Sequence, residues 1–273
     1  MTAATPTKKD RRDQARRERL EREQAEAAAA ARRRRFTRLG AVLAVAAVVV
    51  VALVAVSSSG GGGDKTAATG SAASSSSASS LAGVQASADL LKGIPQDGIS
   101  LGSAKAPVRV LEFADLQCPF CRDYTLNALP AIVEEYVRPG KVKLVFGGIS
   151  FLGPDSETAL RAAYAAGLQN RLWNFITLLY RNQGPENSGW VTDGLLRATG
   201  NSIPGFDTAA MMTGRGTDAV TGAIAAMAQQ ANQAHVTETP TFFAGPTGGT
   251  LQGIHLSSLN ADAFRPTLDS LTK

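Results

Sequence analysis

The sequence predicts an α/β domain that follows a long N-terminal segment of different composition. An apolar strand, a helix and a second apolar strand follow one another between residues 108 and 149, helical patterns fill residues 155–234, and a strand signal returns near residue 241. Strand, helix and strand at this spacing form a right-handed βαβ unit. We therefore expect a βαβ unit, a helical region, a β hairpin and a terminal helix.

The N-terminal residues carry the excess positive charge of the chain. The chain has 28 basic and 23 acidic residues, a net charge of +5, and residues 1–38 hold thirteen of the basic and six of the acidic ones. The rest is nearly neutral, which argues against nucleic acid as a partner of the folded part. Because residues 1–38 lack an apolar stripe, we expect a basic, solvated cytoplasmic tail.

An uncharged apolar run follows directly, from Leu39 to Val56. Its eighteen residues reach the length that a helix needs to cross a hydrocarbon core of about 30 Å. Arginines flank only its N-terminal side, so the positive-inside rule places the tail in the cytoplasm and the later residues outside. A cleaved signal peptide is the alternative, although the run is long for a signal core and no clean A-x-A site follows. We expect a single transmembrane anchor over residues 39–56.

Residues 57–88 are expected to form a flexible linker. Most of this segment is Ser, Gly, Ala and Thr, which cannot bury enough apolar area to offset the entropy of ordering the chain. Folding signals begin near residue 89. We therefore expect the folded domain to span residues 89–273, a length that supports one core.

The first elements of the folded domain have clear signals. Residues 108–113, VRVLEF, are β-branched and apolar, as in a buried strand. Residues 118–137 carry apolar side chains at roughly helical spacing, with Pro119 suited to the first turn and Pro130 expected to kink the helix. Residues 141–149, KVKLVFGGI, predict the second strand.

The remainder consists of helical patterns with one return to strand. Helical stretches separated by Gly and Pro predict a mostly helical insertion over about residues 155–235. TFFA, residues 241–244, predicts a strand, and a short strand near residues 251–254 should follow a Gly-rich turn. A terminal helix is expected after that, with Pro266 inside it.

The only two cysteines of the chain, Cys118 and Cys121, follow the first predicted strand in the motif CPFC. A zinc site needs three or four protein ligands, and with no second cysteine pair or suitably spaced histidine we expect no metal. A structural disulfide would close only a four-residue loop and gain little chain entropy. Redox exchange is favoured over both, because the N-terminus of a helix stabilises a thiolate at Cys118.

Redox exchange requires different roles for the two sulfurs. A thiolate attacks a disulfide through a mixed-disulfide intermediate, so the reaction needs an exposed nucleophile and a shielded resolving thiol. Cys121 lies one helical turn after Cys118, near enough to attack a mixed disulfide there.

Two separated motifs resemble one known family. GSAKAPVRVLEFADLQCPFC, together with VTETPTFFAG far downstream, is similar to the DsbA-like thiol-disulfide oxidoreductases of the thioredoxin superfamily, especially the membrane-anchored Gram-positive type. The similarity runs from about Gly102 to the end of the chain. It implies a thioredoxin fold with an inserted helical subdomain, preceded here by the expected single transmembrane helix.

The resemblance assigns roles to individual residues. It implies that Cys118 is the nucleophile and Cys121 the resolving thiol, and that no cofactor takes part. Thr239 and Pro240 match the residue and the cis-proline that face the disulfide, where the backbone before the proline can pair with a substrate strand. A cis X-Pro bond is a minority state and would mark a constrained feature.

Three further positions bear on the expected site. Glu112 matches the buried acidic residue beneath the active site, where a raised pKa would suit proton exchange with Cys121; a carboxylate that faces solvent or makes a structural pair is the alternative. Pro119 and Phe120, between the cysteines, are expected to contact substrate. Many strongly oxidising relatives have His where this chain has Phe120, which leaves the strength of oxidation open.

These observations predict an extracytoplasmic, membrane-anchored thiol-disulfide oxidoreductase that introduces disulfides into exported proteins. The expected partners are exported proteins that contain cysteine and, by the resemblance, a membrane quinone reductase of the DsbB or vitamin K epoxide reductase-like type that reoxidises the protein. Two alternatives stay open. One is a membrane-tethered reductase or isomerase, and the other is a non-catalytic, chaperone-like binding protein with the same fold.

Overall fold

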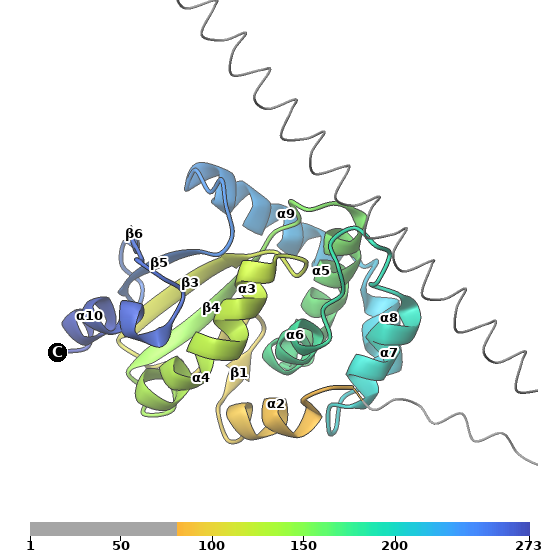
Figure 1. Cartoon of the computed structure of the whole chain (residues 1–273), viewed down its shortest axis with the longest axis horizontal. Coiled ribbons are helices and arrows are strands. Elements are labelled where there is room, and N and C mark those ends of the chain that lie inside the picture. The colour runs from red at the N-terminus through yellow and green to blue at the C-terminus, as the bar shows by residue number, and fades with distance from the viewer. Residues whose placement is uncertain (1–80) are drawn as a thin grey trace, which may run out of the picture. The chain divides into compact units, whose positions relative to one another are not determined.

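A central mixed β-sheet organises residues 81–273, the part of the chain that this computed structural model describes (Figure 1). The strand order is β1-β2-β4-β3-β5-β6. The strands are β1 Gln96–Asp97, β2 Ser100–Leu101, β3 Val108–Ala114, β4 Val142–Gly148, β5 Thr241–Pro246 and β6 Gln252–Gly253. Because β3 pairs in parallel with β4 and antiparallel with β5, it lies inside the sheet.

The predicted tail, the predicted membrane anchor at residues 39–56 and most of the predicted linker lie outside the described residues. Among the helices of residues 81–273, none has both the length and the apolar character to cross a membrane.

The two long parallel strands form where the sequence predicts them. Every residue of β3 except Arg109 is buried, as expected for an apolar, β-branched strand inside a covered sheet. The register places Glu112 beside Phe146 on one side and Phe242 on the other. Because β3 pairs with β4 on one side and β5 on the other, its position in the sheet is fixed along nearly its whole length.

A long helical segment follows β3. It consists of α3 Pro119–Asp123, the π-helical stretch η1 Tyr124–Ala128, α4 Leu129–Ile132 and the π-helical stretch η2 Val133–Val137. Where the sequence predicts a kink at Pro130, the structure has π-helical turns on both sides of α4. Proline has no backbone N–H for the helical hydrogen bond, and wider turns are one way for a helix to accommodate that loss.

Five helices lie between β4 and β5, in the region of the predicted helical insertion. They are α5 Pro154–Gly167, α6 Leu172–Arg181, α7 Asp193–Asn201, α8 Thr208–Gly214 and α9 Asp218–Gln233. Side-chain oxygens of Thr192, Asp207 and Thr217 cap the N-termini of α7, α8 and α9, which fixes where these helices begin. α9 packs against both α5 and β4, and so returns the chain from the helical region to the sheet.

The predicted terminal helix is α10, Ala261–Leu271, with Pro266 inside it. Phe264 on this helix packs edge-on against Phe242 of β5, with ring centroids 4.9 Å apart, and lies 5.4 Å from the ring of Tyr124. These aromatic contacts join α10, β5 and the helical segment after β3 in one core.

Two features before β3 differ from the sequence expectation. The helix α2, Val84–Leu91, begins within the predicted linker of residues 57–88, so the folded part starts earlier than expected. It forms because Ser87 and Leu91 are buried and the helix packs against α6, which offsets the entropy of ordering it. The short hairpin of β1 and β2 is also unpredicted. It turns at Gly98, whose φ of 55° favours glycine.

Candidate active site

The two cysteines lie where β3 ends and the next helix begins (Figure 1). Cys118 is the N-cap residue of α3, and Pro119 occupies the first helical position, where its missing N–H costs nothing. The backbone N–H of Cys118 donates to the carbonyl of Asp115 at 3.0 Å. Cys121 lies inside α3 with none of its surface exposed. Both are free thiols in this structure.

The two thiols have opposite pKa shifts. A hydrogen bond from Cys121 is the largest cause that lowers the pKa of Cys118, from its usual 9.0 to about 6, and the Thr239 side chain and backbone amides contribute in the same direction. Burial raises the pKa of Cys121 well above its usual value, and Cys118 and Glu112 raise it further. At neutral pH, Cys118 is therefore mainly a thiolate and Cys121 a thiol. This is the pairing that a nucleophile and a resolving thiol require.

Cys118 is less exposed than the sequence analysis expects for a nucleophile. Only 4% of its surface is exposed, because the residue lines the wall of a cavity of about 590 Å³ instead of projecting from the molecule. We call this space the Cys118 cavity. Its lining residues are Cys118, Pro119, Phe120, Phe151, Leu152, Glu186, Val236, Thr237, Glu238 and Thr239. A partner thiol therefore has to enter this cavity to meet the sulfur.

The segment before β5 brings Thr239 and Pro240 to the cysteines. The Thr239–Pro240 peptide bond is cis. The carbonyl oxygen of Thr239 lies 3.2 Å from Sγ of Cys118 and accepts the hydrogen bond of the thiol form. That contact favours the protonated sulfur, but the donors that favour the thiolate prevail in the pKa of Cys118. The structure thus places the Thr239 carbonyl against Cys118, and the roles of Thr239 and Pro240 toward a disulfide stay predictions.

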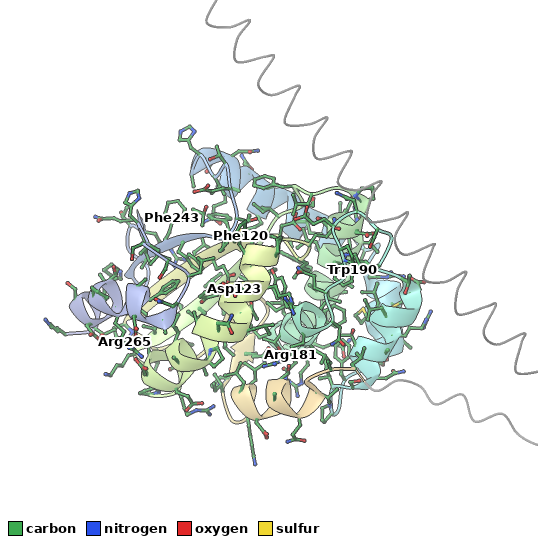
Figure 2. The ribbon with its side chains drawn as sticks, viewed as in Figure 1. Phe120, Asp123, Arg181, Trp190, Phe243 and Arg265 are labelled. Carbon is green, nitrogen blue, oxygen red and sulfur yellow. The ribbon has the colours of Figure 1, made fainter. Side chains whose placement is uncertain are left out.

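Phe120 separates the Cys118 cavity from a neighbouring hollow. This residue is 63% exposed in the N-terminal turn of α3 (Figure 2). The neighbouring hollow has a volume of about 560 Å³ and is lined by Phe120, Glu238, Thr239, Pro240, Thr241, Phe242, Phe243, Gly253, Ile254, His255, Leu256 and Leu259. Phe120, Glu238 and Thr239 line both spaces, so the two hollows adjoin on either side of Phe120.

Glu112 lies in the interior, on β3. Its side chain is buried, forms no ion pair with a described residue, and leaves Oε1 without a hydrogen-bond partner among residues 81–273. Burial first, and the charge of Cys118 second, raise its pKa from 4.5 to about 8. The same carboxyl also raises the pKa of Cys121, so the two buried groups interact electrostatically.

Sequence reasoning missed Asp115, which organises the backbone around the site. This carboxylate has no exposed surface. Its donors are the amides of Gln117, Phe151 and Leu152 and the hydroxyl of Ser156, at distances between 2.7 and 3.1 Å. Asp115 therefore holds the loop before Cys118 and the loop of Phe151 and Leu152 together, and with them one wall of the Cys118 cavity.

The amide side chains of buried Gln117 and half-buried Gln183 extend this arrangement into the helical region. Gln117 accepts from the backbone N–H of Asn187 at 2.7 Å and donates to the Ser156 hydroxyl at 3.0 Å. Gln183 donates to the carbonyl oxygens of Leu116 and Cys118 at 3.0 and 3.2 Å. Hydrogen bonds from the helical insertion thus fix the backbone around Cys118.

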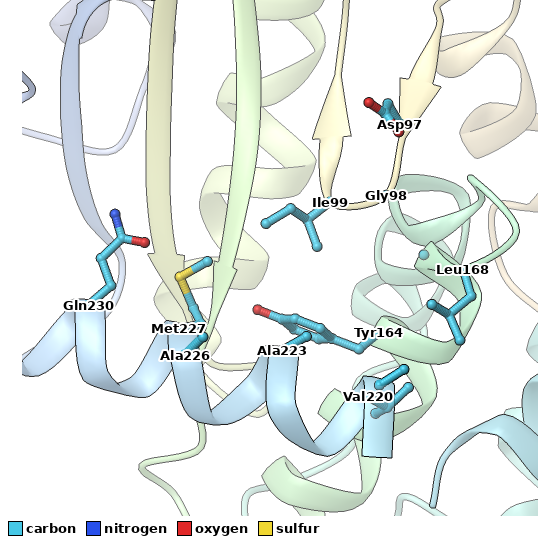
Figure 3. Close-up of a pocket in the computed structure, with 12 residues that line it drawn as sticks. Asp97, Gly98, Ile99, Tyr164, Leu168, Val220, Ala223, Ala226, Met227 and Gln230 are labelled. Atoms are coloured by element: carbon cyan, nitrogen blue, oxygen red, sulfur yellow. The ribbon is translucent and has the colours of Figure 1, made fainter. Parts of the chain in front are cut away.

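A separate cavity of about 440 Å³ lies between α5, α9 and the β1–β2 turn (Figure 3). Apolar side chains such as Val220 and Met227 line it, and the Tyr164 side chain is directed into it. None of the predicted site residues borders this space, so we place the candidate active site at the Cys118 cavity. Among residues 81–273, no three His, Cys, Asp or Glu side chains are grouped to hold a metal ion.

Comparison with known proteins agrees with this geometry. A family model described as thioredoxin matches residues 95–248. A probable disulfide bond formation protein D from Bacillus cereus is 40% identical over 99 residues, which make up 36% of this chain and 46% of that protein. The chain thus spans less than half the length of this curated relative.

Two solved structures share the fold. Oxidised BdbD from Bacillus subtilis matches with a TM-score of 0.56 and 22% identity, over 66% of this chain and 97% of that chain. The alpha-DsbA1 protein of Wolbachia pipientis matches with a TM-score of 0.52 and 22% identity, over 68% of this chain and 96% of that chain. The chain therefore belongs to the thioredoxin family, and its fold is the DsbA-like form, with helices inserted into the thioredoxin core.

Proposed function

We propose that this protein is a thiol-disulfide oxidoreductase that donates a disulfide to cysteine-containing proteins outside the cytoplasm. The asymmetry of the two thiols carries the proposal. Cys118, with its lowered pKa, borders an open cavity, whereas Cys121, with its raised pKa, is enclosed behind it. A disulfide with a purely structural role does not require its two thiols to differ in pKa and in access to a cavity. The B. cereus relative is named for disulfide bond formation, which is the same direction of transfer.

The proposed cycle starts from the Cys118–Cys121 disulfide. A substrate thiolate attacks Sγ of Cys118, the bond to Cys121 breaks, and Cys121 leaves as a thiolate that takes up a proton. The substrate is then joined to Cys118 in a mixed disulfide. A second substrate thiolate attacks the substrate sulfur of this bond, so that the substrate disulfide forms and Cys118 leaves as a thiolate. Two electrons pass from the substrate to the protein, and the second substrate proton is released to water.

The pKa values suit the leaving groups of this cycle. A thiol of lower pKa leaves faster, so the pKa of about 6 for Cys118 favours release of the oxidised substrate. Cys121 has a raised pKa and leaves poorly unless it is protonated. Glu112, with a pKa of about 8, holds a proton at neutral pH and is our proposed donor to Cys121.

We propose that an extended substrate segment lies across the cis-proline. Its cysteine enters the Cys118 cavity, and its flanking residues occupy this cavity and the neighbouring hollow on the two sides of Phe120. The backbone of Thr239 is the proposed partner of the substrate strand, with Pro119, Phe120 and Pro240 in contact with its side chains.

The sequence supports a membrane-anchored location for this chemistry. The apolar run at residues 39–56, with arginines on one side, is the proposed anchor, and it would leave the folded domain outside the cytoplasm. A membrane quinone reductase of the DsbB or vitamin K epoxide reductase-like type is the proposed reoxidant. Alkaline phosphatase, which folds only where disulfides form, should be active when fused after residue 273 and inactive when fused within residues 1–38.

Two cysteine variants test the mechanism. Oxidised full-length protein in non-ionic detergent should convert reduced ribonuclease to its disulfide-bonded form, and Cys118→Ser should not. Cys121→Ala, mixed with a disulfide-bonded peptide, should retain a stable mixed disulfide at Cys118, because the resolving thiol is missing. Full activity of Cys118→Ser would disprove the mechanism. If Cys121→Ala formed no mixed disulfide, the non-catalytic binding protein would become the better account.

A further inference from the structure

The Cys118 cavity combines acidic and aromatic side chains at its mouth. Glu186 comes from the segment after α6 and Glu238 from the segment before the cis-proline, and both are exposed. Phe120 and Phe151 line the same cavity and are 63% and 49% exposed. No Lys or Arg is found among the lining residues of the cavity or of the neighbouring hollow. The entrance to Cys118 is therefore apolar and negatively charged.

These two carboxylates are not neutralised within residues 81–273. The five ion pairs of this region involve other residues, and neither glutamate side chain forms a hydrogen bond with a described residue. Arg122, the basic residue nearest to the cysteines in the sequence, uses Nε to donate to the carbonyl oxygen of Tyr180 at 3.1 Å. Glu186 and Glu238 thus present their charge to whatever enters the cavity.

We propose that the Cys118 cavity selects substrate cysteines that have a basic residue and an apolar residue close to them in the chain. The inference rests on the proposed function and specifies its substrate class. Glu186 and Glu238 attract Lys or Arg and repel Asp or Glu beside the substrate cysteine. Phe120 and Phe151 contact the apolar residue, and an exposed aromatic face also binds a guanidinium or ammonium group.

The expected selectivity is modest and depends on salt. Ion pairs between exposed groups are weak, so we expect a preference on the order of three- to tenfold at low ionic strength. At about 1 M salt the Debye length is about 3 Å, and the preference should largely disappear. An apolar contribution from Phe120 and Phe151 would persist under that condition.

Three dithiol peptides test the proposal. They share one sequence with an apolar residue near the first cysteine and differ only in the adjacent residue, which is Lys, Gln or Glu. The second-order rate of peptide oxidation is measured with oxidised full-length protein in non-ionic detergent. Because a neighbouring charge changes the intrinsic reactivity of a thiol, each rate is divided by the rate of the same peptide with 2-hydroxyethyl disulfide, which is uncharged. The normalised rates should fall in the order Lys, Gln, Glu.

Two double variants test whether the charge preference arises from the Cys118 cavity. Glu186→Gln together with Glu238→Gln should bring the Lys-to-Glu ratio close to one. Asp89→Asn together with Asp97→Asn removes two exposed charges of the same sign outside the cavity and should keep the ratio. Equal normalised rates with the unmodified protein, or an unchanged ratio in the glutamine variant, would overturn the selectivity. If no peptide were oxidised at all, the proposed function would fail, and this inference with it.

Discussion

Two buried carboxylates lie three residues apart near the end of β3, and their surroundings are opposite. Asp115 accepts hydrogen bonds from three backbone amides and one hydroxyl. Glu112 leaves Oε1 without any partner among the described residues, and burial raises its pKa to about 8. The donors around Asp115 use its oxygens to hold two loops together, whereas burial without such donors favours the protonated form of Glu112. The comparison thus sets the structural role of Asp115 beside the proton-donor role that we propose for Glu112.

The largest expected difference concerns stability. Asp115→Asn keeps the shape of the side chain but turns an NH₂ group toward some of the four donors, which then lose their acceptor. We expect the free energy of unfolding to fall by roughly 3–5 kcal/mol. The matched change Glu112→Gln should alter it by less than about 1 kcal/mol at pH 7, because the carboxyl is already protonated there.

Urea unfolding of the oxidised full-length protein measures both changes, with tryptophan fluorescence as the signal, to which Trp173, buried in α6, contributes. Similar losses in the two variants would remove the distinction between the two carboxylates.

The next expected effect is a dependence of stability on pH. The folded state keeps the Glu112 proton up to a pKa of about 8, whereas the unfolded state loses it near 4.5. The stabilising contribution is complete below the lower value and is lost as the pH rises toward the higher one, by up to about 1.4 kcal/mol per pH unit. The oxidised protein is used because neither thiol then titrates, while burial, the main cause, remains.

Urea unfolding at pH 5, 6 and 7 should therefore show falling stability in the unmodified protein and nearly constant stability in Glu112→Gln. Parallel pH profiles of the two proteins would show that Glu112 does not hold this proton.

A smaller effect is expected on the rate of exchange. If Glu112 gives its proton to Cys121 when a substrate attacks Cys118, then Glu112→Gln should slow formation of the mixed disulfide by roughly tenfold or more. Stopped-flow measurements with excess peptide thiol can follow this step from pH 6 to 9. The exposed, ion-paired Glu134 offers a control, Glu134→Gln, which should react at the normal rate. A normal rate and pH profile in Glu112→Gln would remove Glu112 from the mechanism.

The smallest expected effect tests one donor of Asp115. Ser156→Ala removes one hydrogen bond to the carboxylate and one acceptor of the Gln117 amide, which keeps the carbonyl of Leu152 as a partner. The free energy of unfolding should fall by about 1 kcal/mol. The apparent pKa of Cys118, read from thiolate absorbance at 240 nm, should stay at about 6, because Ser156 does not contribute to it. A clear change in that pKa would mean that the Asp115 region tunes the thiolate as well as the loops.

Sequence reasoning predicts the parts of the fold that have a strong local pattern. The strands β3, β4 and β5 are apolar runs long enough for their type to be recognised, and α10 is an amphipathic segment with two buried residues, Phe264 and Leu268. The strands β1 and β2 have two residues each, too few for an alternation to show. The helix α2 forms through its packing on α6, which no local composition within the predicted linker indicates.

The residues of the candidate site also divide into those that a local sequence pattern indicates and those that only the folded chain reveals. Cys118, Cys121, Thr239 and Pro240 are found through two motifs, although they are far apart in the chain. Asp115 is missed because most of its partners lie between residues 151 and 156, a contact that only the folded chain creates. One signal was present: Asp115 and Gln117 interrupt an otherwise apolar stretch before Cys118, and polar residues buried in such a stretch need hydrogen-bond partners.

The midpoint potential of the Cys118–Cys121 couple tests most directly whether the protein donates disulfides. A Cys118 pKa of about 6 stabilises the reduced form, so we expect a potential above the value of about −270 mV for thioredoxin and toward the value of about −120 mV for DsbA. The measurement equilibrates the full-length protein in glutathione buffers and counts free thiols by trapping. A potential at or below about −270 mV would contradict disulfide donation and favour the reductase. A couple that does not titrate would contradict redox exchange altogether.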